Sequence, residues 1–306
     1  MQNKKILANI LLLVTALIWG SAFVAQRVGM DFIGPFTFNF ARFSLSTIVL
    51  IPIIFFMQKK SGDQSRATDE KVYDKKTFFI ASLICGSFLF AGSSLQQFGL
   101  VFTTAGKSAF ITTLYILLVP IMGLFFKHRV NLGGWIAVIM GTAGLYFLCI
   151  TESFTIAKGD FIVLIGAFFW ASHVLAIDHF LPRVDAVKLA MAQFAVCSFY
   201  SFIAMLLFEH PSFKDILAAG IPILYAGVMS GGVGFTLQIL GQKYTTPTVA
   251  SLLLSMESVF ALVAGFLLLH EKMSGREFFG CVLMFIAIVI SQIPEDFFRK
   301  KNNMAN

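Results

Sequence analysis

The sequence predicts an all-α membrane protein with ten transmembrane helices, arranged as two five-helix repeats of inverted topology. Three observations support this fold class. Of the 306 residues, 58% are hydrophobic and 13% are charged, about half of the roughly 25% charged residues of a soluble domain. Apolar runs long enough to cross a bilayer recur along the whole chain. Finally, one part of the chain repeats another at a fixed spacing.

The apolar runs predict ten spans. A helix needs about 20 residues to cross roughly 30 Å of hydrocarbon. Only helices or closed barrels satisfy the backbone in lipid, and these runs are too long for barrel strands. No cleavage site follows the first run, so we interpret it as a retained helix and not as a signal peptide. The predicted spans are 6–26, 35–57, 78–100, 105–126, 132–150, 159–179, 186–208, 216–240, 246–269 and 275–293.

The distribution of charge predicts the orientation. With both termini in the cytoplasm, most of the 23 Lys and Arg residues fall on the cytoplasmic side, as the positive-inside rule requires. The hydrophilic stretch 58–76 then forms a cytoplasmic loop. The net charge of +7 therefore marks topology, and no nucleic-acid partner is expected.

An internal repeat divides the chain into two halves. Residues 95–128 align without a gap on 237–270, a spacing of 142, and the identical pairs include Leu95/Leu237, Gln96/Gln238, Gly99/Gly241 and Thr103/Thr245. A weaker repeat relates "IWGSAF" (18–23) to "FWASHV" (169–174), 151 residues later. The predicted halves are 1–150 and 151–306. Because five spans is an odd number, the second half enters the membrane from the opposite face. Such inverted repeats are typical of secondary transporters, whose substrate sites lie near the midplane between the halves.

Sequence motifs for catalysis are absent. The Gly-Lys-Ser triplet at 106–108 is no P-loop, because the first glycine of that motif would have to stand where Val101 does. The chain contains no H-E-x-x-H, no G-x-S-x-G and no C-x-x-C. No catalytic residue, no metal site and no enzyme activity are therefore predicted.

Ionisable residues deep within spans are the first candidate binding residues. Arg42, His173 and Glu257 lie in apolar segments, where a charge costs at least about 2.5–3.5 kcal/mol and so marks a cavity or a partner. The spacing of 142 pairs Glu257 with Tyr115, both near mid-depth. The hypothesis is that Glu257 binds a substrate amine or takes up a proton, with His173 as its hydrogen-bond partner or a second titrating group. The alternative is a static pair between Glu257 and Arg42.

Aromatic and amide side chains complete the candidate set. Trp19 and Trp170 occupy equivalent positions in the weaker repeat, too deep for an interfacial belt; they either line a pocket or pack. Gln96 and Gln238 lie near opposite helix ends, where hydrogen bonding between helices is the expected role and gating an alternative. Asn39 is also included as a substrate-binding candidate.

Two features predict how helices pack. The small residues of "GVMSGGVG" (227–234) are spaced to let helix backbones approach closely. Pro120 predicts a kink within span 105–126, because a proline removes a backbone hydrogen bond.

Several segments resemble a known family. They are "ALIWGSAFV" (16–24), "FARF" (40–43), "LQQFGLVFTTAGKSAFITTLYILLVP" (95–120), "SMESVFALVAGFLLLHE" (255–271) and "GCVLMFIAIVIS" (280–291). Together they resemble the EamA-type ten-helix members of the drug/metabolite transporter superfamily. The resemblance implies transport of small metabolites, often amino acids, by alternating access in a bacterial inner (plasma) membrane. One departure is Ser258 after Glu257, where the family commonly has proline.

The expected function is secondary-active transport of a small metabolite, first an amino acid or related amphiphile, in the outward direction. The alternatives are an exporter of cationic or aromatic drug-like compounds, and a non-transporting membrane scaffold or embedded enzyme. No cofactor is expected, although coupling to protons is an option. The expected partners are the metabolite and the lipid bilayer, with the chain acting as a monomer or homodimer.

Overall fold

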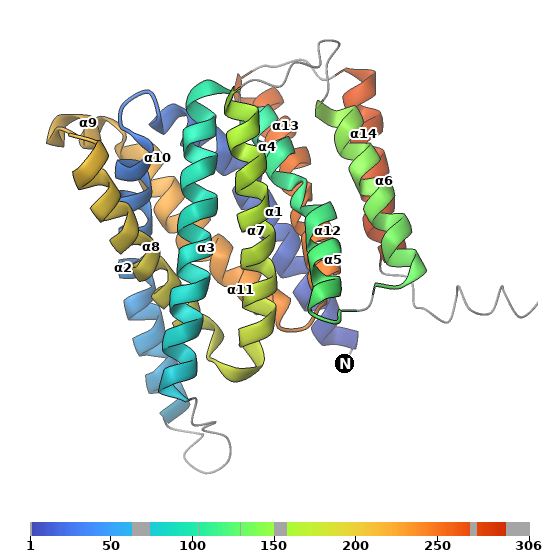
Figure 1. The fold of residues 1–306 in the computed structure, drawn as a ribbon, viewed down its shortest axis with the longest axis horizontal. Coiled ribbons are helices and arrows are strands. Elements are labelled where there is room, and N and C mark those ends of the chain that lie inside the picture. Colours follow the sequence, from blue (N-terminus) through green and yellow to red (C-terminus); the bar gives the residue numbers. More distant parts are fainter. Residues whose placement is uncertain are drawn as a thin grey trace, which may run out of the picture.

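The computed structural model describes residues 2–62, 74–103, 105–128, 130–149, 158–269 and 274–291, and long helices lying side by side dominate it (Figure 1). The helices of the first half are α1 (Gln2–Gly29), α2 (Pro35–Gly62), α3 (Lys75–Phe102), α4 (Ala105–Thr113), α5 (Tyr115–Phe125) and α6 (Leu132–Cys149). Those of the second half are α7 (Lys158–Phe180), η1 (Leu181–Arg183), α8 (Ala186–Phe208), α9 (Phe213–Ala218), α10 (Gly220–Leu224), η2 (Tyr225–Phe235), α11 (Thr236–Gln242), α12 (Pro247–Leu254), α13 (Met256–Leu269) and α14 (Gly275–Ser291).

The apolar helices make this a multi-pass membrane protein. Within the described residues, eight segments are long and apolar enough to cross a membrane, and two shorter apolar helices cover Leu132–Phe147 and Phe278–Ser291. Large hydrophobic side chains such as Phe125, Leu207 and Ile221 are exposed on the outside, which suits a lipid environment. A count of ten membrane-spanning helices stays a prediction.

The two halves of the chain pack into each other. The most extensive contacts join a helix of one half to a helix of the other: α3 to α7, α6 to α14, α2 to α8 and α1 to α13. The first helices of the halves also start at opposite edges of the bundle, since α1 begins at the lower edge of Figure 1 and α7 at the upper edge. The core therefore lies between the halves and not within either one.

Two of the predicted spans are interrupted near their centres. Span 105–126 forms α4 and α5, separated at Leu114, whose N–H bonds the Ile111 carbonyl at 3.2 Å. Span 246–269 forms α12 and α13, separated at Ser255. Pro120 lies within α5 and α12–α13 has no proline at its interruption, so a proline kink is not the common cause.

The predicted span over 216–240 is found, since Gly220–Gln242 is long and apolar enough to cross a membrane, but residues 213–242 do not form one uniform α-helix. This segment forms α9 and α10, then the π-helical turns of η2, then α11. A π-helix is rare and often marks a functional region. Backbone carbonyl groups of η2 accept hydrogen bonds from side chains far away in the sequence. Thr15 donates to Gly234 (3.2 Å), Trp19 to Ser230 (3.2 Å) and Ser46 to Gly227 (2.7 Å). Hydrogen bonds from α1 and α2 thus stabilise the widened backbone.

The close packing predicted for 227–234 is confirmed. A Cβ atom at Gly227 would lie 3.0 Å from the Arg42 carbonyl oxygen, and one at Gly231 would overlap the Ser46 hydroxyl. Only glycine lets η2 approach α2 this closely.

Candidate functional site

A cavity lies between the two halves, and helices of both halves line it. Seven of the nine candidate residues line this cavity: Trp19, Arg42, Gln96, Tyr115, Trp170, Gln238 and Glu257. Sequence reasoning missed the other seven lining residues, which are Phe23, Gln26, Thr112, Val174, Ser230, Phe235 and Leu254.

The acidic group of the cavity is Glu257, which is 3% exposed and bonded to Tyr115. The Tyr115 hydroxyl donates to Glu257 Oε1 at 3.0 Å, across 142 residues of sequence. Both residues follow a helix interruption, since Tyr115 opens α5 and Glu257 is the second residue of α13. Interrupted helices of this kind build substrate sites in membrane transporters, and the positive N-terminal end of α13 favours a carboxylate.

The basic group of the cavity is Arg42, which is 4% exposed. Its Nη1 donates to Gln26 Oε1 at 2.9 Å, and Gln96 Nε2 donates to the same oxygen at 3.2 Å. The guanidinium carbon lies 4.6 Å from the centre of the Phe43 ring. The described residues place no carboxylate within ion-pair distance of Arg42, so the alternative of a static Arg42–Glu257 pair is wrong.

Aromatic rings form a third part of the lining. Trp19 and Trp170 both pack against Phe235, with ring centres 4.6 Å and 6.0 Å apart respectively. The indole N–H of Trp19 bonds the Ser230 carbonyl. That of Trp170 is buried without a partner among the described residues.

Two of the nine candidates lie outside the cavity lining. His173 is fully buried, and its Nε2 is 2.9 Å from Gln193 Oε1. Its ring stands edge-on to Phe235, at 6.1 Å between centres. The expected hydrogen bond between His173 and Glu257 is therefore wrong, because the bonding partner of Glu257 is Tyr115. Asn39 is buried and donates to Ser94 Oγ at 3.4 Å.

The two amide candidates differ in their bonding. Gln96 bonds Gln26 and so joins α3 to α1, as expected for an interhelical role. Gln238 lines the cavity with a side-chain oxygen that has no partner in the described part of the chain, and the Thr112 hydroxyl is in the same state. Among the described residues, no three His, Cys, Asp or Glu side chains cluster as metal ligands would.

Helices of transmembrane length around a cavity that charged, amide and aromatic side chains line, between two similar halves, define a multi-pass membrane protein of the transporter class. Residues 6–150 and 157–292 each match the EamA-like transporter family, and the chain belongs to that family.

Similar proteins agree with this assignment. An uncharacterized transporter of Archaeoglobus fulgidus is 29% identical over 291 residues, covering 94% of this chain and 86% of the relative. The uncharacterized transporter YoaV of Bacillus subtilis is 24% identical over 281 residues, covering 90% and 93% respectively. A solved crystal structure superposes with a TM-score of 0.74 at 15% identity over 93% of this chain and 96% of that one, which shows a shared fold.

Proposed function

We propose that this chain is a secondary-active transporter that exports a small amino-acid-like metabolite by alternating access around the central cavity. The observation that carries the proposal is the lining of that cavity, to which both halves contribute charged, amide and aromatic side chains. We place both termini in the cytoplasm of a bacterial inner membrane, with the chain acting as a monomer or homodimer.

Contacts that recur in the two halves support an inverted two-fold repeat. A Cβ atom at Gly99 would meet Val163, and one at Gly241 would meet Leu12. The glycines are 142 residues apart and their partners 151, the two spacings of the internal repeat. Residues related by a two-fold axis meet where the axis passes between them, and Tyr115 and Glu257 meet in this way.

The Glu257–Tyr115 pair is the proposed centre of substrate and proton exchange. A buried carboxyl group whose hydrogen-bond partner among the described residues is a neutral phenol can bind an amine or carry a proton. Intramembrane carboxyl groups commonly serve these roles. We propose His173 as a second titrating group. It lies outside the cavity lining and packs against Phe235, which lines the cavity.

A second candidate function is export of cationic or aromatic drug-like compounds. Glu257 and the rings of Trp19, Trp170 and Phe235 favour it, because aromatic faces attract cations. The permanent positive charge of Arg42 in the same lining disfavours it. A scaffold would have no need of a cavity shared between the two halves, and an embedded metalloenzyme would need a cluster of metal ligands, which the described residues do not contain.

Accessibility of the cavity from both membrane faces tests the proposal. Ser230→Cys and Thr112→Cys, each in a variant without native cysteines, are treated with a membrane-impermeant thiol reagent in right-side-out and inside-out vesicles. We expect labelling from both faces. Ser212→Cys, on the exposed surface, and Ala167→Cys, fully buried, are the controls; the first should label from one face and the second from neither. Labelling of both cavity positions from one face alone contradicts alternating access.

A further inference from the structure

We infer that Arg42, Gln26 and Gln96 form an anion subsite that binds a carboxylate group of the transported molecule, which makes the substrate a zwitterion and not a simple amine. This inference rests on the proposed function and specifies its substrate class.

The charge of Arg42 is the first ground. A guanidinium stays protonated in proteins, and a buried charge is destabilising unless it is paired and hydrogen-bonded. Arg42 is 4% exposed, and its partners are a neutral amide oxygen and two phenylalanine rings. Its Nε is buried with no acceptor in the described residues. A bound anion would supply the missing counter-charge.

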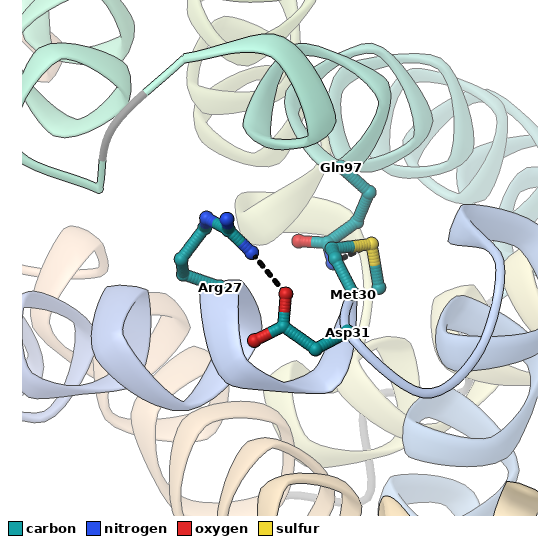
Figure 2. A network of polar contacts seen from close by, with 4 residues as sticks. All are labelled: Arg27, Met30, Asp31 and Gln97. Carbon is teal, nitrogen blue, oxygen red and sulfur yellow. Dashed lines mark hydrogen bonds and ion pairs between the residues drawn. The ribbon is translucent and has the colours of Figure 1, made fainter.

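A neighbouring arginine, Arg27, differs from Arg42 in having a carboxylate partner. Arg27, one residue after Gln26, is 42% exposed and forms a 2.7 Å ion pair with Asp31 (Figure 2). In the same region Gln97 donates to the Met30 sulfur at 3.4 Å, which joins α3 to the end of α1 (Figure 2). The charge of Arg27 is thus already compensated outside the cavity lining, whereas that of Arg42 is uncompensated within it.

The two glutamines hold the site together. The single oxygen Gln26 Oε1 accepts from both Arg42 and Gln96, so it fixes two donors at one place in the cavity lining. The planar guanidinium offers further N–H groups in the fork geometry that matches a carboxylate. Arginine is preferred over lysine for this kind of recognition.

The subsite and Glu257 lie at different depths. Gln26 is three residues before α1 ends, Arg42 seven after α2 begins and Gln96 six before α3 ends, so all three are close to one edge of the bundle. Glu257 and Tyr115 instead follow the central interruptions of α12–α13 and α4–α5. The cavity lining therefore holds a cation and an acidic group at different depths of the bundle. A molecule with a carboxylate and an ammonium group complements both.

The test compares molecules that share one apolar body. L-leucine, isopentylamine and 4-methylpentanoate form one series; L-phenylalanine, phenethylamine and 3-phenylpropanoate form the other. Binding to the purified full chain is measured by thermal stabilisation over a concentration range. In wild type, the amino acid of at least one series should bind more tightly than its amine. Arg42→Gln should lower the affinity for that amino acid at least tenfold and leave the amine unchanged. Arg183→Gln, which removes an exposed arginine, should change neither.

A second variant keeps the test decisive if Arg42→Gln does not fold. Gln26→Glu has nearly the same shape and places a carboxylate against Arg42, so it should fill the anion subsite from within. We expect an unchanged or higher melting temperature, an affinity for the amino acid at least tenfold lower, and an unchanged affinity for the amine.

Three results overturn the inference. The first is that wild type and Gln26→Glu bind the amino acid with equal affinity. The others are that wild type binds the amines but not the amino acids, or that neither amino acid stabilises wild type against thermal unfolding. None of them overturns transport by alternating access, which two-sided labelling of the cavity tests separately. Binding of amines alone would favour the exporter of cationic compounds.

Discussion

Trp19 and Trp170 occupy equivalent positions in the two halves, yet they are held in different ways. The indole N–H of Trp19 bonds a carbonyl of η2, whereas that of Trp170 has no partner in the described structure. Each ring faces a glycine, Trp19 facing Gly234 and Trp170 facing Gly92, and these glycines are 142 residues apart. The positions are therefore alike, and the bonding differs.

The difference lies in the helix that each tryptophan faces. Trp170 faces α3, a continuous α-helix whose inner carbonyl groups are used within the helix. Trp19 faces the π-helical turns of η2, where the Ser230 carbonyl accepts its N–H. The comparison teaches that the two halves keep the same packing positions while their polar groups have diverged. Pairs of substitutions at equivalent positions test this conclusion.

The largest effect is expected where the halves meet, at Glu257 and Tyr115. Glu257→Gln removes the acidic partner that we propose for the substrate ammonium. Loss of one buried charge partner costs about 2–5 kcal/mol, roughly thirtyfold or more in transport. Tyr115→Phe removes one hydrogen bond and should cost about tenfold. Counterflow in proteoliposomes, with the compound that best stabilises wild type, measures both. A Glu257→Gln variant as active as wild type would exclude this role for Glu257.

The next effect concerns Gly20, whose equivalent in the second half is Ala171. A Cβ atom at Gly20 would lie 2.6 Å from the Glu257 carbonyl oxygen and 2.8 Å from the Ala261 nitrogen. Because both are backbone atoms of α13, Gly20→Ala should destabilise the protein by about 1–3 kcal/mol, seen as a lower melting temperature. Gly106→Ala is the control, since no heavy atom lies within 4 Å of its Cβ position. Equal melting temperatures for the two variants would contradict the close α1–α13 contact.

A smaller effect separates the two tryptophans themselves. Trp19→Phe loses the hydrogen bond to the Ser230 carbonyl, whereas Trp170→Phe breaks no hydrogen bond found in the described residues. Trp19→Phe should therefore be the more destabilising of the two, by about 1 kcal/mol or more, in chemical or thermal unfolding. If Trp170→Phe were the more destabilising variant, the hydrogen bond of Trp19 would not explain the difference in stability.

The smallest effect is expected at the glycines that face the tryptophans. A Cβ atom at Gly234 would lie 2.7 Å from the Trp19 indole nitrogen, and one at Gly92 would lie 3.2 Å from the Trp170 ring. Gly234→Ala should displace Trp19 from its hydrogen bond, at about 1 kcal/mol, and Gly92→Ala should cost less. Melting temperatures of the two variants measure the difference. A larger loss for Gly92→Ala would mean that the Trp170 side of the cavity is the more rigid one.

Much of the candidate site could be predicted because its residue types stand out. Glu257 and Arg42 are ionisable groups in apolar spans, and the spacing of 142 identified Tyr115 as the counterpart of Glu257. Phe235 escaped prediction because its equivalent is Ser93, so the repeat gave no signal there. Gln26 lies in the last turn of α1. A polar residue there is typical of the end of a membrane span, so nothing in the sequence indicated that Gln26 lines the cavity.

The sequence by itself determined the family, the helical class and the positions of the apolar segments, because each segment must match the thickness of a bilayer and the halves share a repeat. Only the tertiary structure decided where helices are interrupted and which groups meet. The π-helical turns of η2 depend on donors from Thr15, Trp19 and Ser46, which lie about 180 to 220 residues away along the chain. Likewise, the separation of Arg42 from Glu257 within one cavity depends on how α2 and α13 are placed. A local sequence pattern carries neither relation, since both arise from packing between the two halves.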